Sequence, residues 1–234
     1  MSAADHNVRP RRRRVDVEDL AVDNASCTVL LVDDHPLFRC GVAQLIASQD
    51  GFEVVGEAAS AEQGVSMASS LKPDLVLMDL NMGESSGLDA LKQIKDAGLD
   101  SHVIMLTVSD TEQDFIKAVR AGAEGYLLKD SEPEKILEKL RQAARGETVF
   151  TEPLMNLLLE AMREGAPAPP ATEECLTTRE RQILNLIATG RSNKHIAREL
   201  NISDGTVKVH VKNLLRKLNL QSRLEAAVWI LTTS

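Results

Sequence analysis

The sequence LLVDDHPLFRCGVAQLI occupies residues 30–46. Its first three residues are apolar, which is typical of a parallel strand that is covered on both faces. Asp33 and Asp34 follow this strand directly, and from Leu37 onward the apolar residues recur at helical spacing. A buried strand, a polar loop and an amphipathic helix make one βα unit, which is the building block of an α/β fold.

The same pattern recurs along the chain as far as residue 146. The expected strands are Thr28–Val32, Val54–Gly56, Leu75–Met78, Val103–Leu106 and Tyr126–Leu128. The expected helices are Leu37–Ser48, Ala61–Leu71, Leu88–Ala97, Glu112–Ala121 and Pro133–Arg145. Five βα units predict a doubly wound (βα)5 parallel sheet, with the strand order 2-1-3-4-5.

Polar residues follow the expected strands at their carboxyl ends. Asp33 and Asp34 follow the first strand, Asp79 the third, Thr107 the fourth and Lys129 the fifth. Each has an ordinary explanation when it is taken alone, such as helix capping by Asp34. Because the carboxyl ends of parallel strands border one crevice, however, these side chains are expected to converge. Carboxylates that converge repel each other unless a cation lies among them, and oxygen ligands favour Mg²⁺. A lysine and a hydroxyl beside them suit a phosphoryl group.

Three stretches resemble the receiver domain of two-component response regulators: residues 30–46, PDLVLMDLNM at 73–82 and AGAEGYLLKD at 121–130. The resemblance covers residues 27–146, and we assign residues 27–147 to a receiver domain. It implies that Asp79 accepts a phosphoryl group from a phosphohistidine on a sensor histidine kinase. It also implies supporting roles for other residues: Mg²⁺ held by Asp33, Asp34, Asp79 and the backbone carbonyl of Asn81, phosphoryl oxygens paired with Lys129, Thr107 moving toward the phosphate, and Tyr126 following inward as the switch aromatic.

The chain departs from the receiver pattern after Met82, where the family usually has a proline and this chain has Gly83 and Glu84. Losing the proline removes a backbone constraint, and Glu84 adds a carboxylate near the site. A transcription regulator with a degenerate receiver, controlled without phosphate, therefore stays an alternative. A Mg²⁺-dependent phosphatase with Asp79 as its nucleophile is a weaker alternative. Such enzymes typically have a second aspartate two positions after the nucleophile, where this chain has Asn81. We expect that the protein is not an enzyme.

Two segments are expected to lie outside the folded domains. Residues 1–26 form a predicted disordered tail, in which Arg11–Arg14 are interpreted as a solvated arm, with a DNA-touching arm as the alternative. Acidic residues follow where a signal peptide needs an apolar stretch, so we expect a cytoplasmic protein without a membrane partner. Residues 148–175 form the predicted linker. It contains an amphipathic helix at Glu152–Glu164 and then the sequence GAPAPPA at 165–171, which cannot hold a helix.

The formal charge differs between the two halves of the chain. Residues 27–150 carry a net charge of −10, whereas residues 176–234 carry +6. A basic half attracts the phosphate backbone of nucleic acid. The sequence of this basic half predicts a helix at Asn193–Leu200, a turn, and a second helix at Asp204–Leu218, which is capped by Ser203 or Asp204. One face of the second helix is apolar. Its opposite face could enter a major groove and consists of Lys208, Val209, Lys212 and Arg216.

The stretch from residue 176 to 229, with TVKVHVK at 206–212, resembles the LuxR-type helix-turn-helix domain of the NarL/FixJ response regulators. We assign residues 176–234 to a small all-α domain of this type. The resemblance implies binding to double-stranded DNA, with base contacts by Lys208, Val209 and Lys212 and backbone contacts by Asn193 and Lys194. It implies a homodimer in the phosphorylated or DNA-bound form, and transcription control in nitrate- or nitrite-responsive or anaerobic metabolism. It also implies that the unphosphorylated receiver obstructs the recognition helix.

Overall fold

The computed structural model describes residues 26–83, 85–108, 111–164 and 175–233. Apart from Ser26, the expected N-terminal tail with Arg11–Arg14 lies outside these described residues, as do Glu84 and the proline-rich segment at 165–171. Within the described ranges, no helix combines the length and the apolar composition that crossing a membrane requires.

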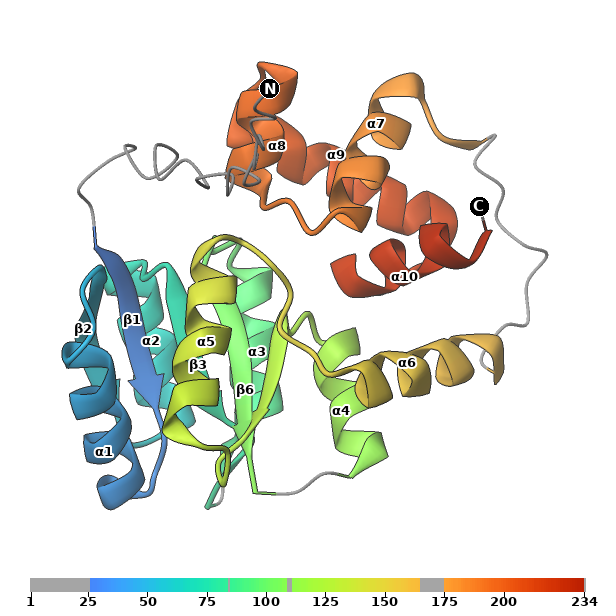
Figure 1. The fold of residues 1–234 in the computed structure, drawn as a ribbon. Coiled ribbons are helices and arrows are strands. Elements are labelled where there is room, and N and C mark those ends of the chain that lie inside the picture. Colours follow the sequence, from blue (N-terminus) through green and yellow to red (C-terminus); the bar gives the residue numbers. More distant parts are fainter. Residues whose placement is uncertain (1–25, 84, 109–110, 165–174, 234) are drawn as a thin grey trace, which may run out of the picture.

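The N-terminal half is built on a parallel sheet (Figure 1). Its strands are β1 (Cys27–Val32), β2 (Phe52–Ala58), β3 (Leu75–Asp79), β6 (His102–Thr107) and β7 (Gly125–Leu128). They lie in the order β2-β1-β3-β6-β7, and every neighbouring pair is parallel. Counted along this sheet alone, the order is the predicted 2-1-3-4-5. β2 is longer than the predicted Val54–Gly56 because its ends pair with both ends of β1.

Helices cover both faces of the sheet, and each face has its own hydrophobic core. The helices are α1 (Pro36–Ala47), α2 (Ala61–Leu71), α3 (Gly87–Asp96), α4 (Glu112–Arg120) and α5 (Pro133–Ala144). Successive strand residues point to opposite faces. Val29 and Leu31 of β1 accordingly pack with α1 and α5, whereas Leu30 and Val32 pack with α2, α3 and α4. Near-continuous apolar strands are thus required by burial on two sides.

A short hairpin between β3 and α3 was not predicted from the sequence. It pairs β4 (Asn81–Met82) with β5 (Ser85–Ser86) around Gly83, whose φ of +54° lies in the left-handed region that favours glycine. The chain then turns into α3 at Gly87, whose backbone nitrogen donates to the carbonyl of Leu80 at 3.1 Å. This turn brings the start of α3 against the end of β3.

Gly87→Ala should destabilise the fold, because a Cβ at this position would overlap with the backbone carbonyl oxygen of Asp79. We expect the free energy of unfolding to fall by about 3 kcal/mol, measured by urea denaturation. The control is Gly41→Ala, in the exposed part of α1, where an added Cβ has open space. There, alanine should raise the free energy of unfolding by up to about 1 kcal/mol. Equal stabilities of Gly87→Ala and the wild type would contradict this account of the turn.

The C-terminal half is helical. After α6 (Glu152–Glu164) the described elements are α7 (Thr178–Ala188), α8 (Asn193–Leu200), α9 (Asp204–Leu218) and α10 (Arg223–Thr233). The predicted bounds of α6, α8 and α9 are confirmed. Ser203 caps α9 by accepting a hydrogen bond from the backbone nitrogen of Thr206, and Asn201 makes the turn between α8 and α9 in the left-handed region. A separate hydrophobic cluster unites α7, α8, α9 and α10.

The two halves contact each other through α10. Leu224 and Val228 on this helix join the core cluster that contains α4 and Leu158 of α6. The Arg120 guanidinium of α4 lies 3.6 Å from the carboxylate of Glu225 of α10. α10 therefore packs on the helical half with one side and on the sheet-containing half with the other.

Candidate functional site

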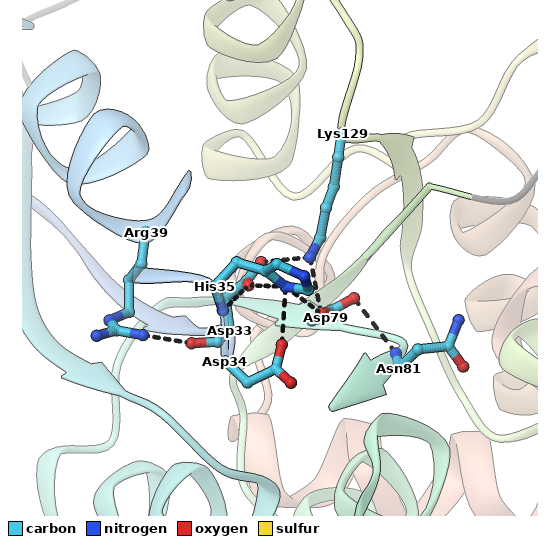
Figure 2. A network of polar contacts seen from close by, with 7 residues as sticks. All are labelled: Asp33, Asp34, His35, Arg39, Asp79, Asn81 and Lys129. Atoms are coloured by element: carbon cyan, nitrogen blue, oxygen red, sulfur yellow. Dashed lines mark hydrogen bonds and ion pairs between the residues drawn. The ribbon is translucent and has the colours of Figure 1, made fainter. Parts of the chain in front are cut away.

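The predicted acidic residues converge at the carboxyl ends of the strands (Figure 2). Asp33 directly follows β1, and Asp79 ends β3; both are buried. Asp34 lies beside them and is partly exposed. Thr107 ends β6 and is buried, and the backbone nitrogen of Lys129, after β7, donates to its carbonyl at 2.8 Å. Strands that are distant in the sequence thus bring these residues to one crevice, as the sheet topology requires.

Lys129 bridges two of the carboxylates. Its Nζ lies 2.7 Å from Asp33 Oδ2 and 2.7 Å from Asp79 Oδ2. The ammonium group also lies over the ring of Phe38, 5.0 Å from the ring centroid, which is a cation–π contact. The other oxygen of Asp79, Oδ1, accepts a hydrogen bond from the backbone nitrogen of Asn81 at 3.2 Å. Both oxygens of Asp79 are therefore oriented by donors.

Burial raises the pKa of Asp79 above its usual value. The hydrogen bond from Lys129 opposes this rise, whereas the charge of Asp33 adds to it. The ionised Asp79 is therefore less favourable here than in water, and a cation between these carboxylates would relieve the repulsion. One carboxylate oxygen from each of Asp33, Asp34 and Asp79 lies within 4.8 Å of the other two, so these oxygens fit a common cation.

Two residues that lie at the crevice, His35 and Arg39, were not predicted as site residues from the sequence. His35 Nδ1 lies 2.8 Å from Asp34 Oδ1 and 3.3 Å from Asp33 Oδ1. Arg39 donates from Nη1 to the backbone carbonyl of Asp33 at 2.5 Å and from Nε to Glu57 at 3.2 Å. Both residues lie in the stretch at residues 30–46, one directly after the aspartates and the other on the first turn of α1. Their position in the sequence predicts that they lie near the crevice, but it does not predict the direction of their side chains.

The predicted switch aromatic, Tyr126, is already buried in this structure. Its ring meets Phe115 edge-on, with centroids 5.5 Å apart, and Phe115 meets Phe150 in the same way at 5.7 Å. The backbone nitrogen of Tyr126 donates to the carbonyl of Val149 at 2.9 Å. The aromatic chain therefore runs from β7 through α4 to the segment that precedes α6.

The predicted DNA-contacting face of α9 is separate from its core face. Val207, Leu214 and Leu218 are buried, whereas Lys212 and Arg216 are exposed and Val209 is 59% exposed. On α8, Asn193 accepts a hydrogen bond from Arg223 at 2.9 Å, and the side chain of Lys194 lies outside the described residues. The helix thus presents the predicted polar face away from its own domain core.

Lys208 of α9 contacts the other half of the chain. Its Nζ lies 2.5 Å from Asp100, in the loop between α3 and β6, and 3.5 Å from Asp204 on its own helix. Burial lowers the pKa of Lys208, but Asp100 and Asp204 outweigh burial and raise it. A cavity of about 1170 Å³ lies between the two halves, and Lys208 and Lys212 both line it. Two of the residues predicted to bind DNA, Lys208 and Lys212, therefore face the sheet-containing half.

Comparisons with known proteins cover both halves. Residues 29–141 match the response regulator receiver domain family, and residues 174–230 match the family described as bacterial regulatory proteins, luxR family. The chain is 49% identical over 203 residues to the nitrate/nitrite response regulator protein NarL of Escherichia coli K12, covering 87% of this chain and 94% of that protein. A nitrate/nitrite response regulator protein homolog of Haemophilus influenzae is 48% identical over 200 residues, covering 86% of this chain and 94% of that protein.

Solved structures share the fold of the N-terminal half. The receiver domain of a response regulator, NarL, from Mycobacterium tuberculosis is 29% identical to this chain, with a TM-score of 0.51. The match covers 53% of this chain and 99% of the solved one. A two-component response regulator of the LuxR family from Aurantimonas is 28% identical, with a TM-score of 0.55, and covers 59% of this chain and 99% of that one.

Proposed function

Because the chain belongs to the NarL/FixJ-type two-component response regulators, with a receiver domain and a LuxR-type DNA-binding domain, we propose that it accepts a phosphoryl group on Asp79 from a sensor histidine kinase and binds promoter DNA in response. The observation that carries this proposal is the crevice, in which Asp79 is buried between donors and Lys129 lies 2.7 Å from it. As a cytoplasmic transcription regulator, the protein would not be an enzyme.

The chemistry is a phosphoryl transfer between two side chains. A carboxylate oxygen of Asp79 attacks phosphorus, the phosphorus–nitrogen bond of the kinase phosphohistidine breaks, and the freed imidazole takes up a proton. Mg²⁺, when bound by Asp33, Asp34, Asp79 and the Asn81 carbonyl, would neutralise the charge that gathers on the phosphoryl oxygens. Lys129 would move from the carboxylates to a phosphoryl oxygen, and Thr107 would donate to another. Tyr126 would hold the inward position that it has here.

Phosphoryl uptake tests the proposal directly. The full chain, incubated with acetyl phosphate and Mg²⁺, should gain the mass of one phosphoryl group, read by intact-protein mass spectrometry. A chain that stays unmodified under conditions in which another receiver is labelled would favour the alternative, a regulator with a degenerate receiver that is controlled without phosphate. Gly83 and Glu84 keep that alternative open, since they stand where a proline and a short residue are usual.

Asp34→Ala should weaken Mg²⁺ binding, because the metal needs several anionic oxygens and Asp34 supplies one at the mouth of the crevice. We expect the dissociation constant from isothermal titration calorimetry to rise by at least about tenfold. Asp50→Ala, which removes an exposed carboxylate beyond the end of α1, serves as the matched control and should leave the constant unchanged. Unaltered affinity of Asp34→Ala would remove this residue from the ligand set.

We further propose that the unphosphorylated receiver obstructs α9, and that phosphorylation biases the two domains apart and favours a DNA-bound homodimer. Lys208 supports this, because a side chain expected to contact DNA is held by Asp100 of the receiver. The receiver domain (residues 27–147) and the DNA-binding domain (residues 176–234) would move relative to each other. They are joined by the linker at residues 148–175, which contains α6. Since a ligand shifts such an equilibrium only through different affinities for the two states, DNA and the receiver would compete for α9.

Asp100→Asn should therefore raise the affinity of the unphosphorylated full chain for its operator DNA. The pair is partly exposed, so the expected gain is modest, about three- to tenfold in a fluorescence-anisotropy titration. Asp96→Asn is the matched control: it removes an equal charge from the exposed end of α3 and should change little. If both variants gained affinity to the same extent, general charge rather than the Asp100–Lys208 contact would explain the effect.

We propose nitrate or nitrite as the signal, because the two curated relatives with 49% and 48% identity are named for their response to these ions. Deletion of the gene should then change a set of transcripts only when nitrate or nitrite is present. Transcript changes that are the same with and without these ions would point to another signal.

A further inference from the structure

We propose that His35 is a ligand of the metal ion at the acidic site, and that its nitrogen makes this site bind borderline divalent cations such as Mn²⁺ more tightly than oxygen ligands alone would. The inference rests on the proposed function, because it takes the crevice to be a metal site. The metal site inferred from the sequence contains oxygen ligands only. His35 changes it to a site with mixed oxygen and nitrogen ligands.

The distances around His35 match those between neighbouring ligands of one metal ion. Nδ1 lies 2.8 Å from Asp34 Oδ1, 3.3 Å from Asp33 Oδ1 and 3.9 Å from Asp79 Oδ2. Octahedral ligands at about 2.1 Å from a metal are about 3 Å apart when adjacent and about 4 Å apart when opposite. One donor atom from each of these four residues lies within 4.8 Å of every other. Nδ1 thus stands where a further protein ligand, beside the three carboxylates, would stand.

The backbone directs the ring toward the crevice (Figure 2). His35 precedes Pro36, the first residue of α1, and has an extended conformation with φ −87° and ψ 103°. Its backbone nitrogen donates to Asp33 Oδ1 at 2.8 Å, which ties the residue to the same carboxylate that its side chain approaches. The imidazole is two-thirds exposed, so it can adjust to a cation without moving the core.

His35 and Lys129 divide the carboxylates between them. Lys129 Nζ contacts Oδ2 of Asp33 and Oδ2 of Asp79, whereas His35 faces Oδ1 of Asp33 and Oδ1 of Asp34. A cation on the histidine side can therefore reach one oxygen of Asp33 and one oxygen of Asp34 that Lys129 does not contact. Imidazole nitrogen is a poor ligand for Mg²⁺, which prefers oxygen, whereas the affinity of sites with nitrogen ligands begins to rise at Mn²⁺ and increases along the later divalent metals. The nitrogen of His35 should therefore strengthen the binding of Mn²⁺ more than the binding of Mg²⁺.

Pulsed electron paramagnetic resonance of bound Mn²⁺ tests this assignment. The full chain would carry the heavy nitrogen isotope in its histidines alone, so that a coupling of this isotope to Mn²⁺ identifies a histidine ligand. We expect the coupling in the wild type and in His195→Ala, an exposed histidine of α8 that serves as control, and its loss in His35→Ala. The Mn²⁺ dissociation constant should rise by about tenfold in His35→Ala, while that for Mg²⁺ should change by less than about threefold.

The outcomes separate this inference from the proposed function. Mn²⁺ that binds without a histidine coupling, or with a coupling that persists in His35→Ala, would overturn the role of His35 and leave the acidic metal site standing. A wild-type chain that binds neither Mn²⁺ nor Mg²⁺ in calorimetry would overturn both. Circular dichroism of His35→Ala shows whether the variant is folded, which the exposure of the ring leads us to expect.

Discussion

Asp79→Asn should reduce phosphoryl uptake from acetyl phosphate to background. Asparagine has nearly the same shape as aspartate, so the end of β3 and the hydrogen bond from Asn81 are expected to survive. Its amide oxygen carries no negative charge, however, and is a far weaker nucleophile toward phosphorus. The loss should therefore affect the chemistry and spare the fold. Intact-protein mass spectrometry after incubation with acetyl phosphate and Mg²⁺ measures the modified fraction.

Asp130→Asn is the matched control for this experiment. Asp130 is an exposed carboxylate that directly follows Lys129, so its removal changes the charge near the crevice without touching the buried cluster. The Asp130→Asn variant should be phosphorylated to the same extent as the wild type. Labelling that persists in Asp79→Asn would show that another residue accepts the phosphoryl group, and peptide mapping would then identify it.

The convergence of Asp33, Asp79 and Lys129 could be predicted because it depends on topology alone. Each residue directly follows or ends an apolar strand, and parallel strands in a doubly wound sheet place their carboxyl ends along one edge. The bounds of α8 and α9 were predictable for a similar reason, since Ser192 and Ser203 mark both starts and Asn201 marks the turn between them. Local signals of this kind need no knowledge of distant contacts.

Features that depend on side-chain direction or on long-range packing could not be predicted. The β4–β5 hairpin has strands of two residues each, too short for any periodicity to show. His35 and Arg39 lie near the crevice by sequence, but only their rotamers bring them to Asp33. The pairing of Asp100 with Lys208 joins two polar residues more than a hundred positions apart, and neither position carries a signal for the other.

Lys212→Ala should weaken binding of the DNA-binding domain to its operator by about 1–3 kcal/mol if Lys212 contacts a base edge. The structure favours this kind of contact, because Lys212 lies one turn beyond Lys208 on the exposed face of α9, opposite the buried Val207 and Leu214. A helix that buries one side in its own domain can lay the other in a major groove. Binding to a series of operators with single base changes should then lose its preference at one base pair.

A purely phosphate-contacting Lys212 would behave differently. Affinity would fall evenly across all sequences, and the slope of log affinity against log salt would decrease by about one. The measurement uses the fragment 172–234, which removes the contact between Asp100 and Lys208 and retains the separate hydrophobic cluster of α7 to α10. Arg216→Ala, on the same exposed face one turn further along, gives a comparison at the edge of the expected contact. If the wild-type fragment bound its operator no better than random duplex in moderate salt, α9 would not read sequence, and the salt slope alone would describe its binding.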